Sequence, residues 1–188
     1  MEHMQNATSG ITLEEIIPSY GEKLLRYATS ILCSHQDAED VVQDVFISYF
    51  QNGHRYDIQN LSAWLYKSTY HLCLNRIKST KRRRLLFFED MKSPPAVYME
   101  DNLAMSEIKA VLQRLKPQER ALLYGRVVDG HSYEALSRIL GPSPAALRKQ
   151  YERVKKKAAQ YLDAHGYGQA ASHPRPGLCA QPKGRGGL

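Results

Sequence analysis

Cationic and amide side chains are concentrated on one short stretch near the carboxyl end of the chain. From Pro144 onward, the apolar residues Leu147, Tyr151, Val154 and Ala158 recur at steps of three and four, which predicts a helix with one buried face. The residues left outside this face are Ala146, Arg148, Lys149, Gln150, Glu152, Arg153, Lys155, Lys156 and Lys157. Guanidinium, ammonium and amide groups donate hydrogen bonds to phosphates and base edges. The outer face therefore predicts a helix that enters the major groove of DNA.

A preceding helix must position this one, and the residues before Pro144 supply it. Ser132 is a favoured N-cap for a helix over 133–140, and Gly141 can take the left-handed conformation that ends such a helix. Ser143 can cap the next helix, with Pro144 at its first position. Two helices joined by a short glycine-containing turn are typical of a helix-turn-helix. The alternative is an ordinary helical hairpin with a solvated basic face.

A second charged cluster is acidic and lies on a predicted helix over about 37–51. Ala38, Val41 and Val42 begin its buried stripe. Its outer surface carries Asp37, Glu39, Asp40, Gln43 and Asp44. Such a surface suits the docking of a basic partner. Acidic residues near a helix start also interact favourably with the helix dipole, so simple helix stabilisation is the alternative.

Aromatic and basic residues interleave on a third predicted helix, over about 61–81. Trp64 belongs to its inward face. A different side carries Lys67, Tyr70, His71, Asn75, Lys78, Lys81 and Arg82. Rings stack on unpaired bases while cations hold phosphates, so this side suits single-stranded nucleic acid. The alternative is a core tryptophan beside a solvated flank.

Composition narrows the class of protein. The chain has 188 residues, 43% of them hydrophobic, and a formal net charge of +7, which together favour folded cores and an anionic partner. Cys33, Cys73 and Cys179 are far apart and form no CxxC pair, so we expect no disulfide framework and a cytoplasmic location. No apolar run is long enough to span a membrane, and residues 1–10 lack the apolar centre of a signal peptide.

No arrangement of residues in the sequence predicts catalysis. There is no nucleophile beside a base, no phosphate-cradling glycine loop, and no second ligand at metal-binding spacing from His71. We therefore expect no enzymatic activity, no metal site and no cofactor.

The expected architecture is an all-α fold of two small helical domains joined by a flexible linker. The first helix follows the apolar pattern from Leu13 to Cys33, and Pro18 is expected to bend it or delay its start. Pro94 and Pro95 interrupt the helical pattern, which resumes at 102–115 and 118–128. The predicted organisation is a disordered amino terminus over 1–11, a first helical domain over 12–84, a linker over 85–102, a second helical domain over 103–163 and a disordered tail over 164–188.

Taken in chain order, these features resemble bacterial RNA polymerase sigma factors of the extracytoplasmic-function (ECF) type, within the sigma-70 family. The run from Asp37 to Phe46 resembles the family's second conserved region. Trp64-Leu65-Tyr66-Lys67, continuing to Leu74-Asn75, resembles its promoter-melting helix. The runs 115–120 and 130–136 resemble the start and first half of its fourth region.

The resemblance implies that the chain directs core polymerase to specific promoters and helps to melt DNA, while the polymerase performs the catalysis. The second domain would be a winged-helix-like region 4. The coiled coil of the largest polymerase subunit (β′) would be bound by Asp37, Glu39, Asp40, Gln43 and Asp44. The −10 element would be bound by Tyr56, Lys67, Tyr70, His71 and Lys78. The −35 element would be bound by Ser143, Ala146, Arg148, Lys149, Gln150, Arg153 and Lys156. The other implied partners are the polymerase β flap and an anti-sigma factor, and no membrane insertion is implied.

The sequence departs from the family pattern at several positions. His71 stands where asparagine is common, and Asn75 stands where aspartate is frequent. Lys149, Gln150 and Glu152 also differ from the commoner residues, so base preference is not carried over. A stand-alone helix-turn-helix regulator is the alternative function. Such a regulator would need neither the acidic helix nor the Trp64 helix.

Overall fold

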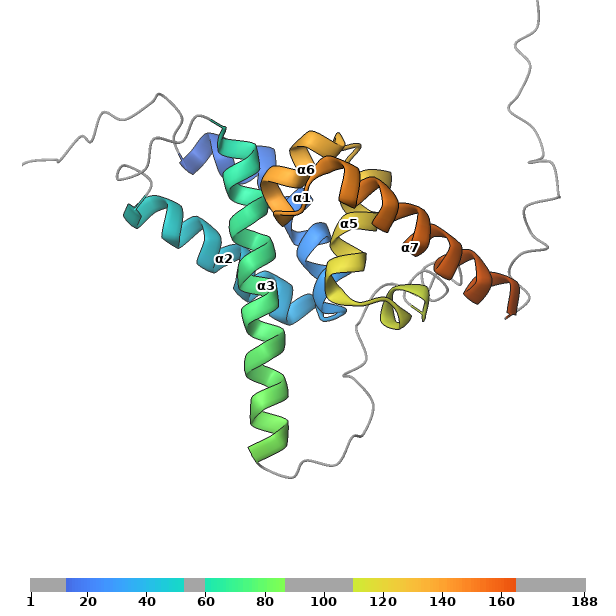
Figure 1. The fold of residues 1–188 in the computed structure, drawn as a ribbon. Coiled ribbons are helices and arrows are strands. Elements are labelled where there is room, and N and C mark those ends of the chain that lie inside the picture. The colour runs from blue at the N-terminus through green and yellow to red at the C-terminus, as the bar shows by residue number, and fades with distance from the viewer. Residues whose placement is uncertain (1–12, 53–59, 87–109, 165–188) are drawn as a thin grey trace, which may run out of the picture.

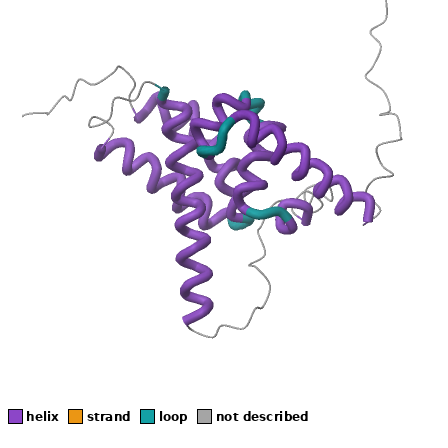
Figure 2. The backbone as a smooth tube through the Cα atoms, in the orientation of Figure 1, coloured by secondary structure: helices purple, strands orange, loops and turns teal. Residues whose placement is uncertain are grey.

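The computed structural model describes residues 13–52, 60–86 and 110–164, and every regular element within these ranges is a helix (Figures 1 and 2). The helices are α1 (Leu13–Leu32), α2 (His35–Asn52), α3 (Leu61–Leu86), α5 (Pro117–Val127), α6 (Tyr133–Leu140) and α7 (Pro144–Ala164). Residues 110–114 are also helical. The predicted all-α fold is confirmed. The predicted linker and disordered ends fall mostly outside the described residues.

The first three helices pack together as one unit. The apolar stripes predicted for α1 and α2 are buried, with Leu24, Ile31 and Val45 fully inaccessible to solvent. Leu65 of α3 completes their shared core. The carboxyl-terminal part of α3 extends away from the other helices (Figure 1). This unit therefore presents α2 and a long stretch of α3 on its outside.

Pro18 lies inside α1 and does not delay its start. A proline nitrogen has no hydrogen to donate to the carbonyl four residues earlier. The neighbouring Ser19 hydroxyl donates a hydrogen bond to the carbonyl of Glu15 at 2.7 Å. Tertiary packing of the apolar stripe thus outweighs the local preference of proline.

Helices α5, α6 and α7 form the second unit. Leu122, Leu136 and Leu147, one from each helix, are almost completely buried together. Pro117 occupies the first position of α5, and the Glu119 carboxylate accepts a hydrogen bond from the Lys116 backbone N–H at 2.7 Å. The leucine core thus holds the three helices together, and local capping fixes the start of α5.

The two units are packed directly on each other. Helix α1 contacts α5, and α3 contacts α6. Ala121 and Ile139 of the second unit lie in the same buried cluster as Tyr27 and Leu65 of the first. Local periodicity does not predict this shared core, because it joins residues about a hundred positions apart in the chain.

Candidate nucleic-acid and protein interfaces

The helix-turn-helix geometry rests on two capped turns. The Ser132 hydroxyl accepts a hydrogen bond from the Ala135 N–H at 3.1 Å, as expected of an N-cap. Gly141 has a φ of 101°, which a side chain would disfavour, and its N–H bonds the Ser137 carbonyl at 2.9 Å. The Ser143 hydroxyl accepts from the Ala146 N–H at 3.3 Å. The predicted helix boundaries in this region are confirmed.

The outer face of α7 is polar and accessible. Leu147 and Val154 are buried against the rest of the unit. The predicted DNA-binding residues Ser143, Ala146, Arg148, Lys149, Arg153 and Lys156 are exposed, and Gln150 is half-buried. Lys157 lies outside this set and pairs with Glu119 of α5 at 3.0 Å. The cations predicted to contact DNA are thus brought to one accessible helix.

Tyr133 organises two arginines near this helix, a role that the sequence did not indicate. The guanidinium of Arg126 lies over the Tyr133 ring at 5.0 Å, and that of Arg148 lies over it at 5.3 Å. Tyr151 of α7 contacts the same ring edge-on, with centroids 6.3 Å apart. Contacts of cations with an aromatic face restrict side-chain orientation, so Tyr133 limits where Arg148 can point.

The acidic face of α2 is only partly free of counter-charges. Glu39, Asp40, Gln43 and Asp44 are exposed, and Asp37 is half-buried. Arg76 of α3 reaches across, with its Nε 2.9 Å from an Asp37 carboxylate oxygen and its Nη2 bonded to Asp40. The hydrogen bond to Asp37, followed by the charges of both carboxylates, raises the pKa of Arg76. Sequence reasoning missed Arg76, because its partners are on another helix.

An apolar groove adjoins the acidic face. It lies between α1 and α2, has a volume of about 530 Å³, and is lined by Leu25, Val42, Phe46 and neighbouring residues. Phe50 lies on its edge with 71% of its surface exposed. Exposed apolar surface beside charged groups is typical of a protein-binding region.

Only part of the aromatic–basic side of α3 is exposed to solvent. Lys67, His71 and Lys78 are exposed, whereas Tyr70 is only 5% exposed and belongs to the buried cluster shared with α6. Trp64 packs against Tyr49 of α2 with ring centroids 5.7 Å apart, in line with the expected core role. Tyr56 lies outside the described residues. The structure therefore exposes the cations of this side but covers Tyr70.

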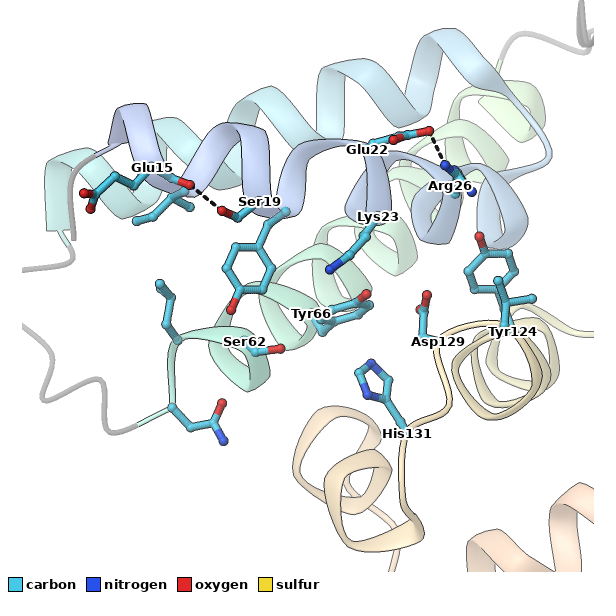
Figure 3. Close-up of a pocket in the computed structure, with 15 residues that line it drawn as sticks. Glu15, Ser19, Glu22, Lys23, Arg26, Ser62, Tyr66, Tyr124, Asp129 and His131 are labelled. Carbon is cyan, nitrogen blue, oxygen red and sulfur yellow. Dashed lines mark hydrogen bonds and ion pairs between the residues drawn. The ribbon is translucent and has the colours of Figure 1, made fainter.

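A cleft of about 980 Å³ lies where the two units meet (Figure 3). Its walls come from α1, the start of α3, and the α5–α6 segment. Tyr66 of α3 lies close to Asp129 and His131 of the α5–α6 segment, and Lys23 extends toward them from α1 (Figure 3). Sequence reasoning singled out none of these residues as functional.

The described residues also bear on two other kinds of function. Among the described residues, no cluster of three or more histidine, cysteine, aspartate or glutamate side chains is arranged to hold a metal ion. None of the helices in the described ranges has the length and apolar character needed to cross a membrane.

Residues 16–83 match the model of sigma-70 region 2, and residues 105–157 match the model of sigma-70 region 4. The chain belongs to the sigma-70 family. Region 2 thus spans the unit of α1 to α3, and region 4 spans the unit of α5 to α7. These are called the region 2 unit and the region 4 unit below.

Curated relatives identify the type of sigma factor. The ECF RNA polymerase sigma factor SigE of Mycolicibacterium smegmatis is 26% identical over 167 residues, covering 85% of this chain and 65% of that protein. This chain therefore spans less than two thirds of the length of SigE. The ECF RNA polymerase sigma factor SigM of Mycobacterium tuberculosis is 23% identical over 151 residues, covering 79% of this chain and 76% of that protein. The chain is of the ECF type.

Two solved structures share the fold. The sigma factor RpoE from Bartonella quintana, in complex with the anti-sigma factor NepR, aligns with a TM-score of 0.67 at 21% identity over 80% of this chain and 96% of that one. CnrH, in complex with the cytosolic domain of CnrY, aligns with a TM-score of 0.61 at 20% identity over 80% and 87% of the two chains. These likenesses support the predicted fold of two sigma domains.

Proposed function

We propose that this chain directs core RNA polymerase to specific promoters and helps to melt the DNA, acting itself without catalysis. The observation that carries the proposal is the combination of three different surfaces in one chain. The region 2 unit carries an acidic helix face beside a basic side of α3, and the region 4 unit exposes a capped basic helix. A stand-alone regulator would use only the last of these.

We assign polymerase docking to α2. The predicted contacts are Asp37, Glu39, Asp40, Gln43 and Asp44, and their partner would be the β′ coiled coil. The apolar groove lined by Leu25 and Phe46 lies beside them and would contribute buried apolar area, which acidic side chains alone cannot. The β flap would contact the region 4 unit.

We assign capture of the unpaired −10 element to α3. Lys67, His71 and Lys78 are exposed for phosphates and base edges, and Tyr56 would supply a ring, as would Tyr70 once its buried ring is uncovered. Unstacking a base step costs a few kcal/mol. Each base that stacks on an aromatic ring returns about 1–3 kcal/mol, so binding of flipped bases can support melting.

We assign the −35 element to α7, through Ser143, Ala146, Arg148, Lys149, Gln150, Arg153 and Lys156. The proposed domain bounds are 12–84 for the first domain and 103–163 for the second. We also infer a cytoplasmic location and an anti-sigma factor as a protein partner. The fold relatives RpoE and CnrH, each solved with such a partner or a partner domain, support the last inference.

Run-off transcription tests the proposal. Purified chain is added to core polymerase on a library of promoter fragments from its source organism, and start sites are mapped. We expect specific initiation that neither component gives alone. A chain that binds duplex promoter DNA tightly by itself, yet neither associates with core polymerase nor changes its start sites, would act as a stand-alone regulator instead.

A further inference from the structure

His131 lines the cleft and connects the two units (Figure 3). Its backbone is fixed to the region 4 unit, because its N–H donates to the Gly125 carbonyl at 2.9 Å and its carbonyl accepts from Arg126 Nη1 at 2.8 Å. Its ring meets Tyr66 of α3 edge-on, with centroids 4.6 Å apart and planes at 89°. The side chain of His131 therefore belongs to the interface while its backbone belongs to region 4.

A second contact between the two units involves Tyr66 and Asp129. Tyr66 also lies close to the carboxylate of Asp129, two residues before His131: burial raises the pKa of the Tyr66 hydroxyl, and the nearby carboxylate raises it further. Asp129 Oδ2 and His131 Nε2 are both buried, and neither meets a hydrogen-bond partner among the described residues. A buried imidazole nitrogen without a partner is tolerable while the ring is neutral, but a second N–H and a positive charge there would be costly.

The titratable and charged groups that line the cleft or contact His131 come from three helices and the α5–α6 segment. Helix α1 contributes Glu15, Tyr20, Glu22, Lys23 and Arg26; α3 contributes Tyr66; α5 contributes Tyr124 and Arg126; and the segment contributes Asp129. Asp129 favours a charged imidazole, whereas Lys23, Arg26 and Arg126 disfavour it. Glu22 is already paired with Arg26.

We propose that His131 is a proton-sensitive latch: its neutral ring holds the region 4 unit closed on the region 2 unit, and its protonation opens the interface. The proposal rests on the geometry of His131. Its backbone is hydrogen-bonded within the region 4 unit, and its ring, whose Nε2 has no partner among the described residues, packs against Tyr66 of the region 2 unit. The contact of Arg120 with α1 and the shared apolar core favour closure at every pH, so the latch biases an interface that already exists.

The direction of the effect follows from linkage. Burial lowers the pKa of His131 below its ordinary 6.5, and the charge of Asp129 only partly opposes that. The open form, with an ordinary pKa, binds the proton more tightly, so closure is complete above about pH 6.5 and weakens as the pH falls. Burial raises the pKa of Asp129 above 3.8, so protonation of this carboxylate favours closure. That effect is complete below about pH 3.8 and is lost as the pH rises through the raised pKa, so it opposes the effect of His131.

Opening of the interface between the two units would change which aromatic rings of α3 are exposed. Tyr66 and Tyr70 are 3% and 5% exposed in the closed arrangement, so neither ring can reach a base there. Release of the region 4 unit would remove the His131 ring from Tyr66 and would remove Ile139 from the buried cluster that contains Tyr70, which increases the exposure of both tyrosines. This consequence, unlike the latch itself, rests on the proposed promoter function.

The test measures closure of the full chain alone, by small-angle X-ray scattering and by hydrogen exchange of α3, between about pH 8 and about pH 5.5. We expect the radius of gyration to rise and the protection of α3 to fall on acidification. The closed-to-open ratio should drop by at most about tenfold per pH unit, the limit for one proton. Far-UV circular dichroism must stay constant.

Matched variants isolate the residue. H131Q should remain closed across the range, H131R should be open throughout, and H35Q, at an exposed histidine of α2, should respond like the wild type. A pH response retained in H131Q, or a wild-type chain whose dimensions do not change with pH, would overturn the latch. If H131Q does not fold, an NMR titration of the His131 ring in the wild-type chain tests the latch instead, because a pKa at or above 6.5 would contradict the latch. None of these measurements uses polymerase, so failure of the promoter function would not affect them.

Discussion

The guanidinium of Arg120 in α5 donates a hydrogen bond from Nη1 to the backbone carbonyl of Ile31, in the last turn of α1, at 2.7 Å. Its Nε also donates to the carbonyls of Leu112 and Leu115, at 2.6 and 3.1 Å. The final carbonyls of a helix have no partner within the helix, and a cation near them interacts favourably with the helix dipole. One side chain thus satisfies two helix ends and joins the two units.

Replacing Arg120 with alanine should therefore destabilise the chain more than an ordinary surface change. Hydrogen bonds to charged groups contribute about 1.5–3 kcal/mol, and partial exposure of Arg120 places the expected loss in the free energy of unfolding near the lower figure. Urea unfolding followed by circular dichroism would measure it. Arg138→Ala, at an exposed arginine of α6, should change stability by less than about 0.5 kcal/mol. Equal effects of the two variants would contradict the bridging role.

Two glycines should respond in opposite directions to alanine. A Cβ at Gly125 would lie 2.9 Å from Leu136 Cδ2 and 3.6 Å from the His131 ring, so Gly125→Ala should cost about 1–3 kcal/mol through overpacking. A Cβ at Gly21 would meet only Ile17, at an ordinary 3.8 Å. Gly21→Ala should instead stabilise α1 by about 0.5–1 kcal/mol, because alanine has the higher helix propensity. Thermal unfolding of both variants checks the pair.

The sequence was sufficient to predict structural features that depend only on neighbours within one or two helical turns. The caps at Ser132 and Ser143 and the positive φ at Gly141 follow from residue types that favour those conformations, and all three were predicted. The sequence was insufficient where a contact joins distant segments. The pairing of Arg76 with Asp37 spans 39 residues, and no periodic pattern encodes it. The same holds for the shared core that buries Tyr70, since a residue on an amphipathic helix flank can face either solvent or another unit.

Reversing the charge of α2 should remove polymerase binding if that face docks as proposed. Asp40→Arg with Asp44→Arg places two cations where two anions face a basic partner, and like-charge juxtaposition costs several kcal/mol. Co-elution with core polymerase would report the loss. The double variant Glu14→Arg with Asp163→Arg makes the same change in net charge at exposed sites on α1 and α7 and should still bind. Retained binding by the α2 variant would mean that its acidic face is only solvated.

The exposed side chain of Arg153 should contribute to sequence reading in the −35 element. If it donates to a base, Arg153→Ala should weaken binding to the chain's own promoters by about 1–3 kcal/mol and relax specificity at one base position. Lys155→Ala, on the same helix but paired with Glu152 at 3.8 Å, serves as the matched control. It should reduce binding slightly and equally for all sequences, as expected for loss of a cation near phosphates. Competition binding on single-base promoter variants, at fixed salt concentration, distinguishes the two.

Tyr133 should act on DNA binding through Arg148 rather than by touching DNA. The ring holds the Arg148 guanidinium at 5.3 Å, and a cation over an aromatic face gains about 0.5–1 kcal/mol at an exposed site. Tyr133→Leu removes the ring and should weaken −35 binding by about two- to fivefold, whereas Tyr133→Phe keeps the ring and should bind as the wild type does. Because Tyr133 also packs beside the leucine core, both variants need a thermal unfolding measurement.

A second experiment combines each variant with Arg148→Ala. If Tyr133 works by positioning that arginine, Tyr133→Leu should have no further effect once Arg148 is gone, and an undiminished further loss would show that the tyrosine acts independently.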